Sequence, residues 1–469
     1  MSCTIAMEAQ ITWRKTYGGF GIDEGRSVKQ MLDGGYLVLG STGSFGFGAS
    51  DMYLIKLDAN GQLLWSNTYG TSDIEQGWGI ASLSDGHALV GYTSSGGGYN
   101  GLLIRIDLNG FLLWQRVYGT PQWDFLYAVD TLSNGFFVAG QTYSNSNGAE
   151  AWLLRTDLNG DTLWTRRFGT PYDDVAHGVK STSDGGCIVA ATFGNSDGTT
   201  DAALVKFAAD GEEEWRTIIG GTANDTGEGV TLTSDGGYVV GGTTESFSVF
   251  SEMLLAKVNS NGESMWLQHV GQVADWEGHQ IMERNDGGLL LVGYTKAFGN
   301  GGKDVYLLFT DSDGNFQQGR TYGGTEDDEG WSIDLASDGG IVVAGDNSSA
   351  GPGVQAVYVV KGDTVGMTAI PQDFPQFDPL PVTEITRNEG ATIWPSLLNP
   401  GEDLHVRLTS SGTDAHARIT DLQGSVVADL AVSQREMTLH LPRLAPGLYL
   451  LSVIQGNKVY RPMKFVIGE

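Results

Sequence analysis

Acidic side chains recur at one place in a repeated unit of about fifty residues, close to the start of the first strand expected in each copy. These acids are Asp23, Asp73, Asp124, Asp173, Asp225, Asp275 and Asp327. Carboxylates converging from several loops could hold a hard cation such as calcium. Alternatively, each aspartate accepts backbone N–H bonds and caps its own loop. Regular repetition favours capping, because a structural need recurs in every copy. Calcium stays open as a ligand, and no other cofactor is expected.

Aromatic residues in the same loops follow no regular pattern. They are Trp78, Trp123, Tyr172, Trp276 and Trp331, with Phe20 in the first copy and none near Asp225. Aromatic faces beside carboxylates suit sugars, because the ring stacks on C–H groups while the acid accepts hydroxyl hydrogen bonds. Packing between neighbouring units is the alternative role for these rings. We therefore predict a ligand site that draws on Asp73, Trp78, Trp123, Asp124, Tyr172, Asp173, Asp275, Trp276, Asp327 and Trp331.

Two histidines, His177 and His279, follow the acidic loops closely. A histidine beside carboxylates could act as a general base. No nucleophile motif accompanies them, and no His/Cys cluster has the spacing of a metal site. We assign no catalytic residue, and the sequence favours binding over catalysis.

The elements that must position these side chains are β-strands. A tryptophan recurs about every fifty residues, and a fixed period of this length indicates copies of one small unit. Its positions are Trp13, Trp65, Trp114, Trp164, Trp215 and Trp266, with Gln318 in the seventh copy. Each copy contains four short strands, and Asp-Gly or Asn-Gly pairs mark hairpin turns between them. We expect the recurrent tryptophans to pack between neighbouring copies.

The strand at which the first copy begins predicts how the two ends of the array meet. The chain begins with an unpartnered fourth strand near residues 11–17, and its last copy ends after a third strand at 356–361. If the N-terminal strand completes the last sheet, the array becomes a ring without a free edge. We predict an all-β fold in which residues 1–365 form a seven-bladed β-propeller of four-stranded blades.

Two segments carry a resemblance to a known group of repeats. Residues 51–70 (DMYLIKLDANGQLLWSNTYG) and 321–345 (TYGGTEDDEGWSIDLASDGGIVVAG) resemble bacterial seven-bladed β-propeller repeats of exported proteins. The resemblance covers about residues 9–361. It implies a fold and an exported setting, but no reaction, because such folds serve many functions.

The sequence changes character after the repeats. Residues 366–390 are rich in proline and predict a linker. Residues 391–469 show short alternating strands, typical of a small β-sandwich. This segment resembles the C-terminal sorting domain of the type IX secretion system, on four motifs: WPSLLNPGEDLHV (394–406), DLQG (421–424), LAPGLY (444–449) and KFVI (464–467). Its opening departs from the usual Pro-Asn-Pro. The resemblance implies export through that machinery, usually with cleavage of the tail.

Composition and charge limit the remaining classes. The net charge of −29 disfavours nucleic acid and anionic membranes as partners. No apolar run is long enough to span a membrane, and residues 1–10 lack the pattern of a signal peptide. We expect that a leader is missing from this sequence, that the protein is secreted or held at the outer-membrane surface, and that it is monomeric.

The predicted function is binding of an extracellular or cell-envelope ligand, with carbohydrate favoured. Two alternatives stay open. One is a glycan-active hydrolase or lyase that uses acids of the loop face. The other is a scaffold that meets only protein partners.

Overall fold

The computed structural model describes residues 10–368, except 146–147, 272 and 352. It also describes residues 391–467, except 395–396, 399–402, 409–414, 421–425, 433, 435, 446, 456–457 and 460–462. The chain divides into two compact units, Met1–Gln372 and Asp373–Glu469. The described residues form strands and turns, and none of their segments is a helix that could span a membrane. The all-β fold class is confirmed.

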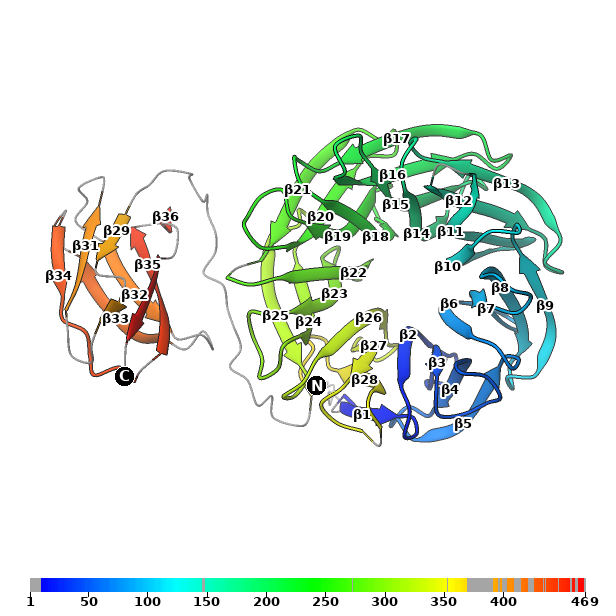
Figure 1. The fold of residues 1–469 in the computed structure, drawn as a ribbon, viewed down its shortest axis with the longest axis horizontal. Coiled ribbons are helices and arrows are strands. Elements are labelled where there is room, and N and C mark those ends of the chain that lie inside the picture. Colours follow the sequence, from blue (N-terminus) through cyan, green and yellow to red (C-terminus); the bar gives the residue numbers. More distant parts are fainter. Residues whose placement is uncertain are drawn as a thin grey trace, which may run out of the picture. The chain divides into compact units, whose positions relative to one another are not determined.

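The first unit contains seven antiparallel four-stranded sheets, arranged around a common centre (Figure 1). Six of them follow the chain directly, from the innermost strand to the outermost. They are β2 (Asp23–Gln30), β3 (Tyr36–Thr42), β4 (Asp51–Leu57), β5 (Leu63–Tyr69); β6 (Glu75–Leu83), β7 (Gly86–Thr93), β8 (Asn100–Asp107), β9 (Leu112–Tyr118); β10 (Asp124–Leu132), β11 (Gly135–Asn145), β12 (Gly148–Thr156), β13 (Thr162–Phe168); β14 (Asp174–Ser181), β15 (Cys187–Gly194), β16 (Thr200–Phe207), β17 (Glu213–Ile219); β18 (Asp225–Leu232), β19 (Tyr238–Thr244), β20 (Glu252–Val258), β21 (Ser264–Val270); and β22 (Trp276–Glu283), β23 (Leu289–Thr295), β24 (Asp304–Thr310), β25 (Phe316–Tyr322).

The seventh sheet joins the two ends of the repeat array. It contains β26 (Asp328–Leu335), β27 (Ile341–Asn347), β28 (Ala356–Gly362) and the N-terminal strand β1 (Trp13–Tyr17). β1 runs antiparallel to β28, with Trp13 opposite Lys361 and Tyr17 opposite Val357. The N-terminal strand therefore occupies the place of the fourth strand that the last copy lacks.

Burial explains why the middle strands read as continuous apolar runs. Every residue of β3 and β4 is buried, because a neighbouring sheet covers each face of their own sheet. Val38 and Ile55 pack in one cluster with Val359 of the seventh sheet. On the other face, Leu39 packs with Leu89 of the next sheet. The hydrophobic core thus lies between sheets and is repeated around the ring.

The recurrent tryptophans join neighbouring sheets at the outer strands, as the sequence predicted. Trp164 packs on Gly211 in the hairpin of the next sheet, where a Cβ atom would lie 2.9 Å from the indole. Its Nε1 donates to the Ala209 carbonyl at 3.0 Å. The other pairs are Trp13 with Gly61, Trp65 with Gly110, Trp114 with Gly160, Trp215 with Gly262 and Trp266 with Gly314. We call these contacts the Trp–Gly joints.

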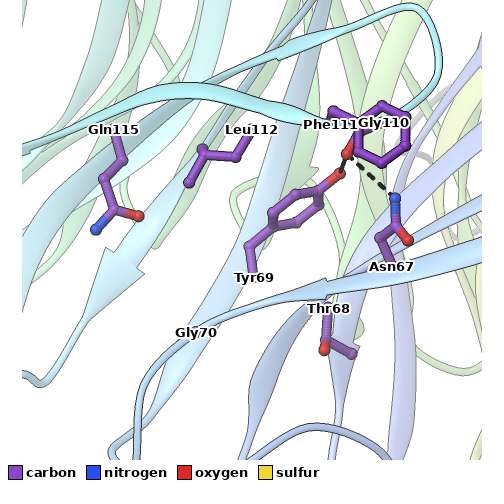
Figure 2. A pocket seen from close by; sticks show the side chains of 8 residues that line it. All are labelled: Asn67, Thr68, Tyr69, Gly70, Gly110, Phe111, Leu112 and Gln115. Carbon is purple, nitrogen blue, oxygen red and sulfur yellow. Dashed lines mark hydrogen bonds between the residues drawn. The ribbon is translucent and has the colours of Figure 1, made fainter.

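A pocket lies beside one of these joints (Figure 2). The Tyr69 hydroxyl donates to the Gly110 carbonyl at 2.6 Å, and Asn67 donates to the same oxygen at 3.1 Å. Tyr17, Tyr118 and Tyr322 donate in the same way to Gly61, Gly160 and Gly366. The contacts in this pocket therefore recur as part of the scaffold.

The second unit contains two sheets. One has the order β29 (Ala391–Trp394), β31 (Leu404–Leu408), β34 (Glu436–Leu439). The other has the order β30 (Leu397–Leu398), β37 (Met463–Ile467), β35 (Gly447–Gln455), β32 (Ala415–Thr420), β33 (Val426–Val432), with β36 (Lys458–Val459) paired to β35. Val406 of the first sheet shares one core with Ala417, Leu451 and Phe465 of the second. The predicted linker and the DLQG motif lie mostly or wholly outside the described residues.

A Trp–Gly joint can be tested with matched glycines of one sheet. Gly211 has φ +85 and lies against Trp164, whereas Gly198 has φ +87 and nothing within 4 Å. Gly211→Ala and Gly198→Ala introduce the same backbone strain, because both glycines have a positive φ. Only Gly211→Ala also places a methyl group against the indole of Trp164. We expect Gly211→Ala to lose roughly 1–3 kcal/mol more unfolding free energy than Gly198→Ala in urea titrations. Equal losses would show that the indole contact contributes nothing.

Candidate functional site

Buried acids begin six of the seven innermost strands, and they cap loops. The Asp23 carboxylate accepts the Gly19 N–H at 2.7 Å, and that of Asp225 accepts the Gly221 N–H at 2.8 Å. Glu75, Asp124, Asp174 and Asp328 each accept the backbone N–H four residues earlier in the same way. Of the acids singled out in the sequence, Asp23, Asp124 and Asp225 belong to this buried set. Their carboxylates hold the loop, which is the capping role.

The other acids from the sequence lie in the loops just before the innermost strands. Asp173 accepts the Ala149 N–H at 2.7 Å, and Asp327 accepts the Lys303 N–H at 2.9 Å. Asp275 forms an ion pair with Lys296 at 3.0 Å. Asp73 is exposed, and its backbone carbonyl accepts the Ala49 N–H. The contacts of Asp73, Asp173 and Asp327 join each loop to the loop between the second and third strands of the preceding sheet, whereas Asp275 pairs with the corresponding loop of its own sheet. Across the described residues, no three His, Cys, Asp or Glu side chains are grouped to hold a metal ion.

The five loop aromatics of the sequence prediction occupy three different settings. Trp276 stands where the other sheets have the buried acid, is 2% exposed, and packs edge-on against Tyr306. Trp123 is 54% exposed on the loop face, and Tyr172 is also exposed there. Trp78 and Trp331 lie on innermost strands, with ring centroids 6.1 Å apart. The structure therefore brings Trp78 and Trp331 together and leaves the others apart from them.

A chain of aromatic contacts leads from the loop face to the centre of the ring. Exposed Trp123 contacts Tyr99, with ring centroids 5.6 Å apart, and Tyr99 contacts Phe125 at 5.4 Å. Phe125 stacks parallel to Tyr127 at 6.3 Å, and Tyr127 meets Trp78 at 5.0 Å. We call these residues the aromatic path. It links the solvent-facing loops to the innermost strands through rings alone.

Each innermost strand carries a β-bulge at the same place, which leaves one residue out of register with the second strand. These residues are Arg26, Trp78, Tyr127, His177, Glu228, His279 and Trp331. We call them the bulge ring. Their strands, β2, β6, β10, β14, β18, β22 and β26, surround the centre in Figure 1.

Neighbouring side chains of the bulge ring contact one another around the centre. The Arg26 guanidinium lies 4.0 Å from the Trp331 ring and 5.0 Å from the Trp78 ring. His279 stacks on Trp331 with centroids 4.0 Å apart. On the other side, Tyr127 stacks on His177, and His177 Nδ1 lies 3.3 Å from a Glu228 oxygen. Seven sheets thus contribute to one cluster.

Sequence reasoning selected only two members of this ring as ligand-binding residues. Arg26, Tyr127 and Glu228 were missed, and the two histidines were considered only as bases. A signal was present, because each ring residue stands three positions after the residue that begins its strand. That offset is constant, whereas the residue type changes from sheet to sheet.

The position two residues before the bulge is acidic on one side of the centre and not on the other. Two positions before the bulge residue stand Glu24, Glu277 and Glu329 on adjoining sheets. Arg26 pairs with Glu24 at 3.2 Å, Lys303 pairs with Glu329, and the Tyr294 hydroxyl donates to Glu277. The equivalent residues on β10, β14 and β18 are Phe125, Val175 and Thr226. The arrangement breaks the sevenfold repetition of the backbone.

Asp346 is a buried carboxyl group behind this acidic side. It accepts the Gly25 N–H at 2.9 Å and the Trp331 Nε1–H at 2.9 Å, and Arg26 lies 3.6 Å away. Burial raises the pKa of Asp346 to about 7, with Arg26 opposing the rise. Burial also lowers the pKa of His279 to about 3, so this imidazole is neutral near pH 7.

Residues 393–468 match the family described as the secretion system C-terminal sorting domain. The resemblance drawn from the C-terminal motifs is confirmed, and such a tail implies an exported protein. No protein with a curated description matches the chain.

Several solved structures are similar to the chain. A fungal alcohol oxidase in complex with copper has a TM-score of 0.47 at 11% identity, covering 98% of this chain and 100% of its own. PorZ, a surface component of the type-IX secretion system of Porphyromonas gingivalis, has a TM-score of 0.43 at 13% identity, covering 97% of this chain and 60% of its own. A periplasmic gluconolactonase of Pseudomonas aeruginosa has a TM-score of 0.46 at 11% identity, covering 87% and 100%.

The raised pKa of Asp346 predicts a pH dependence of stability. Because the folded pKa lies near 7 and the unfolded value near 4, the protonated form is favoured by folding. The stability that this group contributes is present at low pH and is lost as pH rises from about 4 to 7. Asp346→Asn removes the titration, so wild type should lose unfolding free energy relative to the variant between pH 5 and 7.5, measured by urea titration. A difference that is constant over this range would contradict the assignment.

Proposed function

We propose that the first unit is a seven-bladed β-propeller, closed by its N-terminal strand, that binds a carbohydrate on the face where its innermost strands begin. Closure is supported by the pairing of β1 with β28. A ring without a free sheet edge gives loops from all seven sheets a common frame. The ligand would be a component of the cell envelope or of the extracellular medium.

The main support for carbohydrate binding is the aromatic path. It starts at exposed Trp123 and ends at Trp78 in the bulge ring, beside Glu24 and Arg26. Sugars present apolar C–H faces and hydroxyl groups, and a row of rings flanked by charged side chains meets both requirements. Asp73, Asp173, Asp275 and Asp327 line the same loop face, so they and Tyr172 are proposed to contact the outer part of the ligand. Trp276 and Asp124 are enclosed and would support the site from behind.

The sorting tail supports the cellular setting. We propose that the chain is delivered by the type IX secretion machinery and acts at the outer-membrane surface or after release. The net charge of −29 is compatible with a soluble partner and disfavours anionic polymers such as nucleic acid.

A second function, glycan hydrolysis, is favoured by one observation. Asp346 is buried with a raised pKa, whereas Glu24 lies on the other side of Arg26 and is more exposed. Two carboxyl groups in different environments are the arrangement that glycosidases use for acid and base. Asp346, however, already accepts hydrogen bonds from Gly25 and Trp331, so binding is the better-supported function.

A glycan array with the full chain tests the proposal. We expect wild type to bind a defined set of glycans, and Trp123→Ala to bind them roughly tenfold more weakly, because an exposed aromatic platform is a typical hot spot. Phe111→Ala is the matched control, since Phe111 is also exposed but lies in the β8–β9 hairpin at the other end of the strands.

Two results would overturn the proposal. One is the absence of glycan binding with and without calcium, which would direct the search to protein partners. The other is an equal loss in Trp123→Ala and Phe111→Ala. Release of reducing ends from a bound glycan, abolished in Asp346→Asn, would replace binding with hydrolysis.

A further inference from the structure

The bulge ring combines a repeated backbone with side chains that do not repeat. The bulge recurs in all seven innermost strands, so it is a property of the blade. The residue that it presents is different in kind in most sheets: Arg26, Trp78, Tyr127, His177, Glu228, His279 and Trp331. Each of them carries a hydrogen-bonding group or a charge. A purely structural position would repeat one residue type, as the Trp–Gly joints do.

Unsatisfied polar atoms concentrate in this ring. Nine buried side-chain nitrogen and oxygen atoms of the described residues lack a hydrogen-bond partner. Four of them belong to the ring, namely Trp78 Nε1, both ring nitrogens of His279, and Arg26 Nη1, which makes no hydrogen bond but lies 3.6 Å from an Asp346 oxygen. Buried polar groups are almost always paired, because leaving one unpaired costs stability. The remaining candidate partners are ordered water and a ligand.

Water reaches the ring, so a ligand group can replace it. The His177 and Glu228 side chains are 26% and 24% exposed, although they lie at the centre of the fold. The Arg26 side chain retains 12% exposure. The other four residues of the ring are also only partly buried, so solvent touches the whole ring.

The donor and acceptor capacity of the unpaired atoms indicates which ligand group they would bind. Arg26 and Trp78 can only donate, whereas neutral His279 offers one donor and one acceptor. The Glu228 carboxylate on the same ring accepts. A ligand hydroxyl both accepts and donates, so it can meet both kinds of partner. Arg26 and His279 already cover the Trp331 ring, so Trp78 is the tryptophan of the two that suits the C–H face of a sugar ring.

The surrounding charge selects against an acidic sugar. Glu24, Glu277 and Glu329 stand beside the ring, and the cations that pair with them are Arg26 and Lys303. Farther along the same strands, Lys29 pairs with Asp334 at 3.5 Å and Lys180 with Asp130 at 3.9 Å. The lysines there are balanced by acids, so no excess positive charge is left to attract a carboxylate.

We propose that the bulge ring is the specificity-determining part of the site and receives one neutral sugar unit. This inference rests on the carbohydrate-binding function proposed above. In this arrangement Arg26, Trp78 and His279 donate to sugar oxygens, Glu228 accepts from a hydroxyl, and Glu24, Glu277 and Glu329 repel uronic acids. The outer end of the aromatic path binds the rest of the ligand and does not discriminate between neutral and acidic sugars.

Titration calorimetry of the full chain with paired probes tests the inference. The neutral probes are cellohexaose, mannohexaose and xylohexaose, and the acidic probes are hexamers of galacturonate and mannuronate. We expect binding of a neutral probe, weakened roughly 3–10-fold in Trp78→Phe and in His279→Phe, because each loses hydrogen bonds but keeps a ring. Phe111→Ala should bind as wild type does.

A variant that removes one negative charge tests the selectivity between acidic and neutral probes, which a purely structural role of the residue would not change. Gln in Glu277→Gln can still accept from Tyr294, so packing is preserved while one negative charge is removed. The ratio of acidic to neutral binding should rise about fivefold, with neutral binding nearly unchanged.

The outcomes separate this inference from the proposed function. If wild type binds no probe and no arrayed glycan, the proposed function fails and this inference fails with it. If Trp123→Ala loses binding but Trp78→Phe and His279→Phe do not, the ring holds only water and this inference alone is wrong. A wild-type preference for uronate probes would also overturn it.

Discussion

The fold depends on the contact between an outer-strand tryptophan and a glycine of the next sheet. The middle strands are apolar on both faces, so each sheet needs a neighbour on both sides. The Trp–Gly joint fixes that neighbour at the rim, since an indole fits only where the facing residue has no Cβ atom. The tyrosine hydroxyls beside it satisfy the hairpin carbonyls at the same time. Six of the seven junctions have this joint, so the sheets can differ elsewhere without losing their spacing.

The sheets differ most in the side chains of their innermost strands. Their first residue is a buried acid in six sheets, and its hydrogen bonds hold the adjoining loop. Three residues later, the bulge releases one side chain from the ladder and lets it face the other sheets. A rigid rim and a variable centre are therefore built from one repeat. The aromatic path runs from the loop face to this centre along β10 and β6, away from the glutamates of β22 and β26.

Periodicity made the scaffold predictable from the sequence, but not the centre. Features that recur in every copy, such as the role of Trp164 between sheets, can be read from spacing alone. Trp276 and Trp331 look alike in the sequence, yet the first replaces a buried acid and the second occupies a bulge. Their difference depends on exact alignment of the copies within one or two residues. A bulge also inverts the alternation of inward and outward residues, so a simple strand pattern places the side chains that follow it on the wrong face.

Pairing of the two ends of the array has a consequence for folding. Residues 13–17 form their strand pairing with residues 357–361, at the far end of the repeats. Contacts so distant in sequence form late, because chain entropy is lost on closing a long loop before the stabilising contacts form. Six sheets can assemble as they are synthesised, but the seventh must wait until the last repeat is present. Until β1 pairs with it, β28 keeps an open edge to which another extended segment could add, so the joining of the two ends also protects the chain from association through that edge.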